Sequence, residues 1–186
     1  ISTCCRIPYD ETIRRAKEAG LDGIVLTNHY YDGYVTDGDF DAFAARYAEE
    51  YRLAEAYGKE IGFPVLFGIE LSANAFQDAH IKIYGVKPSF VLRHPKMFEY
   101  PPEKLHQTVH AEGGVLVQAH PLRWGGFLRD LRYLDGIEMN CHPSYEGPRF
   151  EDLAPIAREN GKFVTCGSDY HGDVAFRPRG GGFVSG

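Results

Sequence analysis

The sequence has no long apolar segment. None of its apolar runs approaches the ~20 residues that a bilayer-spanning helix requires, so we expect no membrane partner. It also lacks a recognisable secretory leader and any C-x-x-C pair, since its four cysteines are Cys4, Cys5, Cys141 and Cys166. This cysteine usage favours a reduced, cytoplasmic protein.

Two phosphate-binding loops are missing as well. The chain contains neither G-x-x-x-x-G-K-[ST] nor a G-x-G-x-x-G after a predicted strand, so nucleotide-driven transfer and dinucleotide redox chemistry lack their usual binding loops. The net charge of -6 gives no general attraction for phosphate backbones, which disfavours a long nucleic acid as partner. A cysteine nucleophile is disfavoured too, because buried cysteines are mostly inert packing residues.

The composition that remains is that of one globular domain. The chain has 186 residues, 44% of them hydrophobic, with both charge signs scattered along it, and we expect a single domain over residues 1–186. Apolar runs predict strands at residues 24–27, 65–71, 81–84, 115–119, 136–140 and 162–166, and helical spacing predicts helices at 10–19, 40–61, 102 to the glycines at 113–114, about 128–134, and 150–160. Residues 86–101 predict an irregular loop with one helical turn. The alternation predicts a parallel sheet wrapped by helices and closed, or nearly closed, into an α/β barrel.

Residues able to bind metals follow these predicted strands. The set comprises His29, Glu70, His120, Asn140, Asp169 and His171. In α/β barrels the active site lies at the carboxyl ends of the strands, so we expect these side chains to converge there. Because several nitrogen and oxygen donors are hard to bury together without a compensating cation, the set predicts a metal site.

The remaining histidines are weaker candidates by pattern alone. His80 begins its predicted strand, which places it at the opposite end of a parallel sheet and indicates a surface or structural role. His94, His106 and His110 lie in a loop and on a predicted helix, and we expect them to face solvent. His142 follows a strand end, where a ligand and a structural role are equally favoured.

The kind of donor limits the kind of metal. Imidazoles with carboxylates, and no thiolate cluster, suit Zn²⁺, Mn²⁺ or Fe²⁺. A carboxylate such as Glu70 can bridge two such ions, and paired ions stabilise both the entering and the leaving oxygen of a phosphoryl displacement. Hydrolysis is the chemistry that such a site favours.

Seven short motifs, taken in order, resemble the PHP (polymerase and histidinol phosphatase) superfamily of metal-dependent phosphoesterases. They are KEAGLDG at residues 17–23, TNH at 27–29, GIE at 68–70, HIKIYG at 80–85, AHP at 119–121, IEMN at 137–140 and GSDYH at 167–171. Together they span nearly the whole chain. The resemblance implies a distorted TIM-like (β/α)7 barrel that holds two or three divalent ions, usually zinc, manganese or iron, and cleaves phosphate esters.

The resemblance also implies roles for single residues. By position, Glu70 is similar to the family's bridging carboxylate, His120 and His80 to ligands of one ion, Asp169 to a ligand of another, and His29 with His171 to ligands of a third. Asp169 and His171 are therefore the catalytic candidates. For His80 the resemblance and the pattern give opposite expectations.

The chain departs from the family pattern in its first part. Asn28 stands where the family has Asp, and a neutral amide orients a histidine and compensates metals less well than a carboxylate. Cys4 and Cys5 occupy the region of a further acidic residue. The family's first strand carries a His-x-His pair, and we expect that strand and its pair just upstream of Ile1.

A phosphate substrate needs cationic donors besides the metals. Arg123, three residues after His120, is the first candidate, with Arg6 and Arg177 after it. The resulting hypothesis is a histidinol-phosphatase-like phosphoesterase acting on a small phosphorylated substrate, such as histidinol phosphate, a small nucleotide or a sugar phosphate. A metal-dependent amidohydrolase and a non-catalytic metal-binding or regulatory PHP domain are the alternatives. The sequence carries no signal of oligomeric state.

Overall fold

The computed structural model describes residues 5–73, 76, 79–122, 128–140 and 150–172. Its helices are α1 (Tyr9–Glu18), α2 (Phe40–Glu60), α3 (Ser89–Arg93), α4 (Pro102–His110) and α5 (Phe150–Glu159). Its strands are β1 (Ile24–Leu26), β2 (His29–Tyr30), β3 (Val65–Ser72), β4 (His80–Tyr84), β5 (Val115–Gln118), β6 (Gly136–Asn140) and β7 (Phe163–Gly167). Single 3₁₀ turns form at Asp32–Tyr34, Met97–Glu99 and Leu131–Tyr133.

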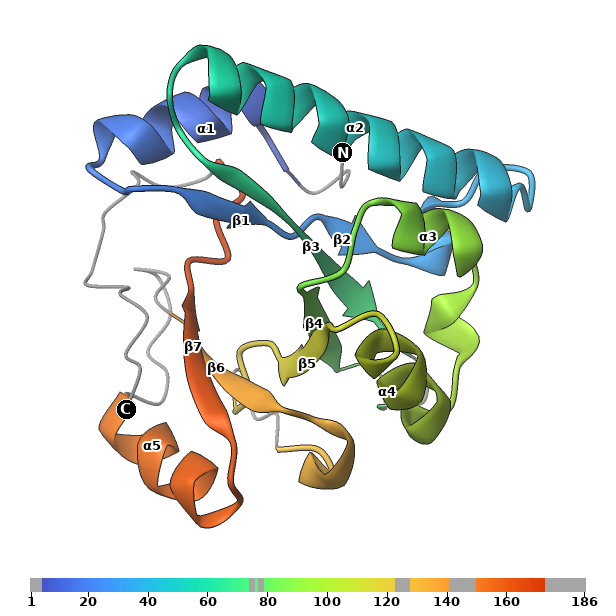
Figure 1. Cartoon of the computed structure of the whole chain (residues 1–186), viewed down its shortest axis with the longest axis vertical. Coiled ribbons are helices and arrows are strands. Elements are labelled where there is room, and N and C mark those ends of the chain that lie inside the picture. The colour runs from blue at the N-terminus through green and yellow to red at the C-terminus, as the bar shows by residue number, and fades with distance from the viewer. Residues whose placement is uncertain (1–4, 74–75, 77–78, 123–127, 141–149, 173–186) are drawn as a thin grey trace.

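The strands form one curled sheet with the helices on its outer face (Figure 1). The strand order is β1-β3-β4-β5-β6-β7, and β2 pairs with β3 beyond the end of β1. Helix α2 packs on α1 and β3, α4 on β5, and α5 on β6 and β7. Within the described residues no ladder joins β7 to β1, so the sheet is a curled half-barrel, and the full (β/α)7 barrel stays a prediction.

The expectation of an all-parallel sheet was wrong, because β4 runs antiparallel to both of its neighbours. The link from β3 to β4 spans only residues 73–79, whereas a parallel return needs a crossover of about a dozen residues or more. The reversal puts the first residue of β4, His80, beside Ser72 at the end of β3. His80 therefore lies at the same end of the sheet as the other candidate ligands.

The first part of the sheet contains an interrupted strand. Segments β1 and β2 both run parallel to β3, and the strand pairing is interrupted at residues 27–28 between them. The Tyr47 hydroxyl, from α2, donates a hydrogen bond to the Asn28 carbonyl at 2.6 Å, and the backbone N–H of Glu70 donates to the same oxygen at 3.0 Å. The break is thus fixed, and it leaves His29 paired with Glu70 in the strand register.

The two faces of the sheet differ in polarity because successive strand residues point to opposite sides. Ile69, Ile81 and Ile83 are fully buried in the apolar core beneath the helices. The alternate positions carry Glu70 and Lys82, which are cross-strand partners on the inner face. The fold therefore places buried charges inside the curl of the sheet.

Two segments differ from the sequence-based expectation. The helix expected over residues 128–134 is a single 3₁₀ turn, and the stretch expected to be a loop with one helical turn contains both α3 and a 3₁₀ turn. None of the six candidate metal ligands lies in either segment. No helix of the described residues combines the length and the apolar character that crossing a bilayer requires.

Candidate metal centre

Six donor side chains lie at one end of the curled sheet. They come from the ends or starts of five chain segments and are His29, Glu70, His80, His120, Asp169 and His171. Two groups of three have ligand atoms that all lie within 4.8 Å of one another, and Glu70 belongs to both. One group adds His29 and His80, and the other adds His120 and Asp169.

Glu70 is the common point of the cluster. Its Oε1 lies 2.8 Å from Nδ1 of His80 and 3.3 Å from Nε2 of His120, and its side chain is only 5% exposed. Burial alone would raise the pKa of this carboxyl. The Lys82 ammonium and the hydrogen bonds from the two imidazoles outweigh burial and hold the pKa of Glu70 well below its usual range. Glu70 is therefore a charged carboxylate placed between two sets of nitrogen donors.

His29 stands beside two other imidazoles. Its ring centroid is 4.9 Å from that of His80 and 5.8 Å from that of His171. Burial, together with the neighbouring imidazoles, lowers the pKa of His29 despite the attraction of Glu70. The neutral ring that results is the form in which histidine binds metals.

The segment after β7 supplies Asp169 and His171. Nδ1 of His171 lies 2.7 Å from the backbone carbonyl of Asp169, and since a carbonyl only accepts, this nitrogen must carry the proton. The remaining nitrogen, Nε2, is thereby left with its lone pair available. Such a carbonyl contact is the usual way in which proteins orient a metal-binding histidine.

Two candidate ligands adopt a backbone conformation that is uncommon for residues other than glycine. His120 has φ 31° and Asp169 has φ 50°, and Leu122, close to His120, has φ 68°. Positive φ is costly for such residues and concentrates at functional sites, where the surrounding structure holds it in place. The strain at both strand ends is consistent with side chains positioned for binding.

A buried ion pair between Lys82 and Glu138 contacts the backbone of the candidate ligand His120. Nζ of Lys82 lies 2.5 Å from Oε1 of Glu138, and the two side chains are 5% and 0% exposed. The other oxygen of Glu138 accepts a hydrogen bond from the backbone N–H of His120 at 3.2 Å. A Cβ on Gly167 would lie 2.0 Å from Oε1 of Glu138, so a glycine is needed beside the pair. The pair thus links β4, β6 and β7 to the backbone of a candidate ligand.

These supporting residues were not predicted from the sequence. Lys82 occupies the polar position between Ile81 and Ile83 in the alternation of its strand, and that alternation does not show that the Lys82 side chain is buried. Tyr47 falls within the helix expected over residues 40–61, and its hydrogen bond to the Asn28 carbonyl arises only in the folded chain. The partnership of Lys82 and Glu138 joins residues 56 positions apart, which no local pattern reveals.

The other predicted residues lie apart from the cluster or outside the described residues. Arg6 is exposed, and its backbone N–H donates to the carbonyl of His171 at 2.9 Å. Of the three histidines expected to face solvent, His110 is exposed, whereas His94 and His106 are partly exposed. Arg123, Arg177 and His142 lie outside the described residues, as does the side chain of Asn140.

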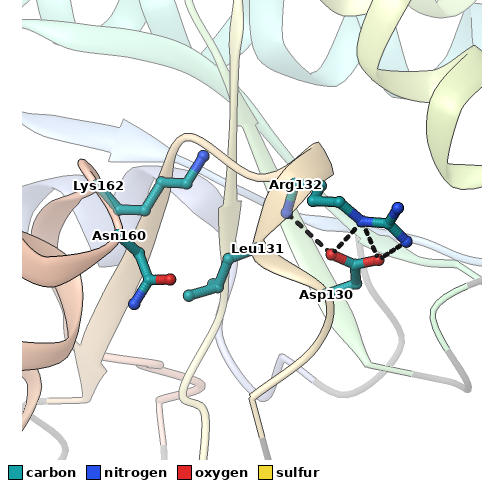
Figure 2. A pocket seen from close by; sticks show the side chains of 5 residues that line it. All are labelled: Asp130, Leu131, Arg132, Asn160 and Lys162. Atoms are coloured by element: carbon teal, nitrogen blue, oxygen red, sulfur yellow. Dashed lines mark hydrogen bonds and ion pairs between the residues drawn. The ribbon is translucent and has the colours of Figure 1, made fainter.

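A surface pocket of about 390 Å³ lies just before the starts of β6 and β7, whereas the donor cluster lies at the other end of the sheet. Figure 2 shows the side chains that line this pocket. Asp130, Leu131, Arg132, Asn160 and Lys162 line it, and Asp130 is turned toward Arg132, with which it forms an ion pair at 2.5 Å. Asp130 and Arg132 are exposed, and they pair with each other. The donor cluster is the stronger candidate for a functional site, because the Glu70 and Asp169 side chains, each 5% exposed, lie there beside four imidazoles.

No protein-family model matches this chain, and no curated protein matches it either. Solved structures do. A candidate metal-dependent phosphoesterase from Bifidobacterium adolescentis has 20% sequence identity and a TM-score of 0.63, over 96% of this chain and 87% of that one. A two-domain protein from Bacteroides vulgatus, which contains a predicted PHP-like metal-dependent phosphoesterase, has 15% identity and a TM-score of 0.64, over 90% of this chain and 48% of that one.

The chain shares the fold of these two solved structures. An amidohydrolase from Chromobacterium violaceum, with bound sulfate and no metal, is also similar, with 17% identity and a TM-score of 0.54 over 94% of this chain and 88% of that one. At these identities the likeness shows the fold alone. The resemblance read from the seven motifs is confirmed at that level, and metal binding by the six residues stays a prediction.

Proposed function

We propose that this chain hydrolyses phosphate esters with two or three divalent ions held by His29, Glu70, His80, His120, Asp169 and His171. The observation that carries the proposal is that Glu70 belongs to two separate donor groups. A carboxylate in that position can contact two ions at once. The donor set, four imidazoles and two carboxylates, fits zinc, manganese or iron better than calcium or magnesium.

When bound, such ions polarise phosphate oxygens and lower the pKa of water, which supplies the nucleophile. The chain's own residues provide the rest. Glu70 stays ionised and buried between the donor groups. The hydrogen bond from Nδ1 of His171 to the Asp169 carbonyl orients the ring and leaves the lone pair of Nε2 available. Asp169, whose side chain is 5% exposed, holds its carboxylate beside these groups, and we assign the catalytic roles to Asp169 and His171.

The substrate we propose is a small phosphorylated molecule. Histidinol phosphate, a small nucleotide and a sugar phosphate all present the phosphate monoester that the site would hold. The backbone N–H of Arg6 donates to the carbonyl of His171, and we keep the exposed guanidinium of Arg6 as a candidate for binding a phosphate oxygen. We keep Arg123 and Arg177 as further substrate-binding candidates.

The test combines metal analysis with an assay of a generic aryl phosphate. Protein loaded with zinc, manganese or iron should release the aryl alcohol, and a chelator should abolish the activity until metal is returned. Glu70→Gln keeps the size of the side chain but removes its charge, so we expect a loss of more than about 100-fold in kcat/KM and fewer bound ions. The matched control is Glu112→Gln, because Glu112 pairs with Arg93 on the surface.

A second candidate function is supported by the likeness to the Chromobacterium violaceum amidohydrolase. The same donors could polarise a carbonyl in place of a phosphate. A panel of amide substrates assayed with the same metal-loaded protein separates the two functions. Turnover of amides without turnover of aryl phosphates would overturn the phosphoesterase proposal, and metal binding with no turnover of either would favour a non-catalytic role.

A further inference from the structure

A second cluster of donors lies on the outside of the sheet. His106 and His110 are one turn apart on α4, so both project from the same face of that helix. Asp135 stands immediately before β6, beside the end of α4. None of these three residues belongs to the candidate metal centre described above.

The three side chains meet closely. Nε2 of His110 lies 2.9 Å and 3.1 Å from the two carboxylate oxygens of Asp135. The rings of His106 and His110 are stacked, with centroids 3.9 Å apart. One ligand atom from each of the three residues lies within 4.8 Å of the others. Only small side-chain shifts separate this arrangement from the donor spacing around one ion.

Hydrogen bonds to the backbone of Leu116 hold Asp135 and its carboxylate in place. The backbone N–H of Leu116 donates to Oδ2 of Asp135 at 2.8 Å, and the backbone N–H of Asp135 donates to the carbonyl of Leu116 at 2.7 Å. These bonds fix Asp135 against β5 while its side chain remains 20% exposed. Metal-binding carboxylates are oriented by outer hydrogen bonds of this kind.

The charges around the cluster have opposing effects on a cation. Asp135 and the negative end of the α4 dipole attract one, whereas Lys162 repels one. Burial foremost, and then the neighbouring His110, lower the pKa of His106, and Lys162 acts in the same direction against Asp135. Burial and the neighbouring cationic groups thus oppose protonation of His106.

We propose that His106, His110 and Asp135 form a second divalent-metal site, of the kind that takes zinc through two imidazoles and one carboxylate. The exposed side of His110 leaves room for water or for a donor from another molecule to complete the coordination. The site lies at the start of β6, whereas the candidate centre lies at the other end of the sheet; the five residues of β6 span roughly 16 Å at the rise of a strand. An ion here ties the end of α4 to the start of β6.

The experiment compares bound zinc in the wild-type full chain and in the variant His106→Gln/His110→Gln after equilibrium dialysis. We expect the variant to lose one zinc per chain and to keep its aryl-phosphate activity within twofold. His94→Gln is the matched control, because His94 also lies near a carboxylate, 3.9 Å from Glu112, but has no second imidazole beside it in the described residues. This control should lose no zinc.

A second measurement needs no variant. In side-chain ¹⁵N NMR of the wild-type chain, the chemical shifts of the ring nitrogens of both His106 and His110 should change as zinc is added. The changes should saturate at one zinc ion for this pair. Equal zinc content in the wild type and the double variant, or ring signals of His106 that stay unmoved, would overturn the proposal. The cluster would then be only a hydrogen-bonded pair of His110 and Asp135 with a stacked neighbour.

Discussion

Replacing Lys82 by methionine tests how much the buried Lys82–Glu138 pair contributes to the free energy of unfolding. Methionine keeps the length of the side chain and removes the ammonium group. Glu138, whose side chain is fully buried, would lose the partner that lies 2.5 Å from its Oε1. The same change removes the strongest favourable charge near Glu70, so the pKa of Glu70 should rise from its lowered value.

The size of the effect follows from the burial of both groups. Removing one partner of a buried ion pair leaves an uncompensated charge and costs about 3–5 kcal/mol. A domain of this size is stable by only about 5–15 kcal/mol. Lys82→Met should therefore remove a large share of the free energy of unfolding.

Urea unfolding followed by far-UV circular dichroism measures this loss. The comparison needs Glu138→Gln and the double variant Lys82→Met/Glu138→Gln, because the double variant removes both charges. A double-mutant cycle should give a coupling of about 0.5–3 kcal/mol. A cost below about 1 kcal/mol for Lys82→Met, measured against the range expected for a buried pair, or additive single changes, would refute the reasoning.

Three further predictions concern the parts that support the centre. Gly167→Ala places a methyl group against Glu138 and should lower the unfolding free energy by about 1–3 kcal/mol in urea titrations; an unchanged midpoint would contradict the tight approach. Tyr47→Phe removes the bond to the Asn28 carbonyl and should cost about 0.5–1.5 kcal/mol, with weaker metal binding in a calorimetric titration as the sign that His29 has moved. Chelation of bound metal should lower the thermal midpoint, since metal at 100 times its Kd stabilises the fold by about 2.7 kcal/mol, and identical melting curves with and without chelator would count against metal binding by the folded state.

The sequence predicted most elements of this fold because their patterns are local. The long helix α2 was expected over residues 40–61 and is observed at Phe40–Glu60, and its cap at Asp39 accepts a hydrogen bond from the backbone N–H of Ala42. The strand β3 is one residue longer than expected. Caps, glycine stops and apolar runs act within a few residues, so they can be read without a structure.

The direction of β4 was the main feature that the pattern reading missed. Alternation of strands and helices indicates a parallel sheet on average, but the short link after β3 was the signal against it here. With the strand reversed, His80 joins Glu70 rather than facing the opposite end. The family resemblance implied that His80 and His120 bind one ion; the donor groups instead join His80 to His29 and His120 to Asp169, with Glu70 in both. The role of His80 as a metal ligand stays a prediction.

The inner charges and the second cluster show a different limit. His106 and His110 have the helical spacing of a shared face, which the sequence displays, yet Asp135 meets them only through the packing of α4 beside the start of β6. Lys82 and Glu138 likewise meet only across the sheet. Side chains that are brought together by tertiary packing cannot be paired from spacing alone.

The most direct test of the central claim is anomalous diffraction from crystals of the metal-loaded protein, collected at the absorption edges of zinc, manganese and iron. We expect at least one peak on each side of the Glu70 carboxylate, one between His29 and His80 and the other between His120 and Asp169. Metal-loaded crystals with no anomalous peak near Glu70, while protein from the same preparation hydrolyses aryl phosphates, would contradict it.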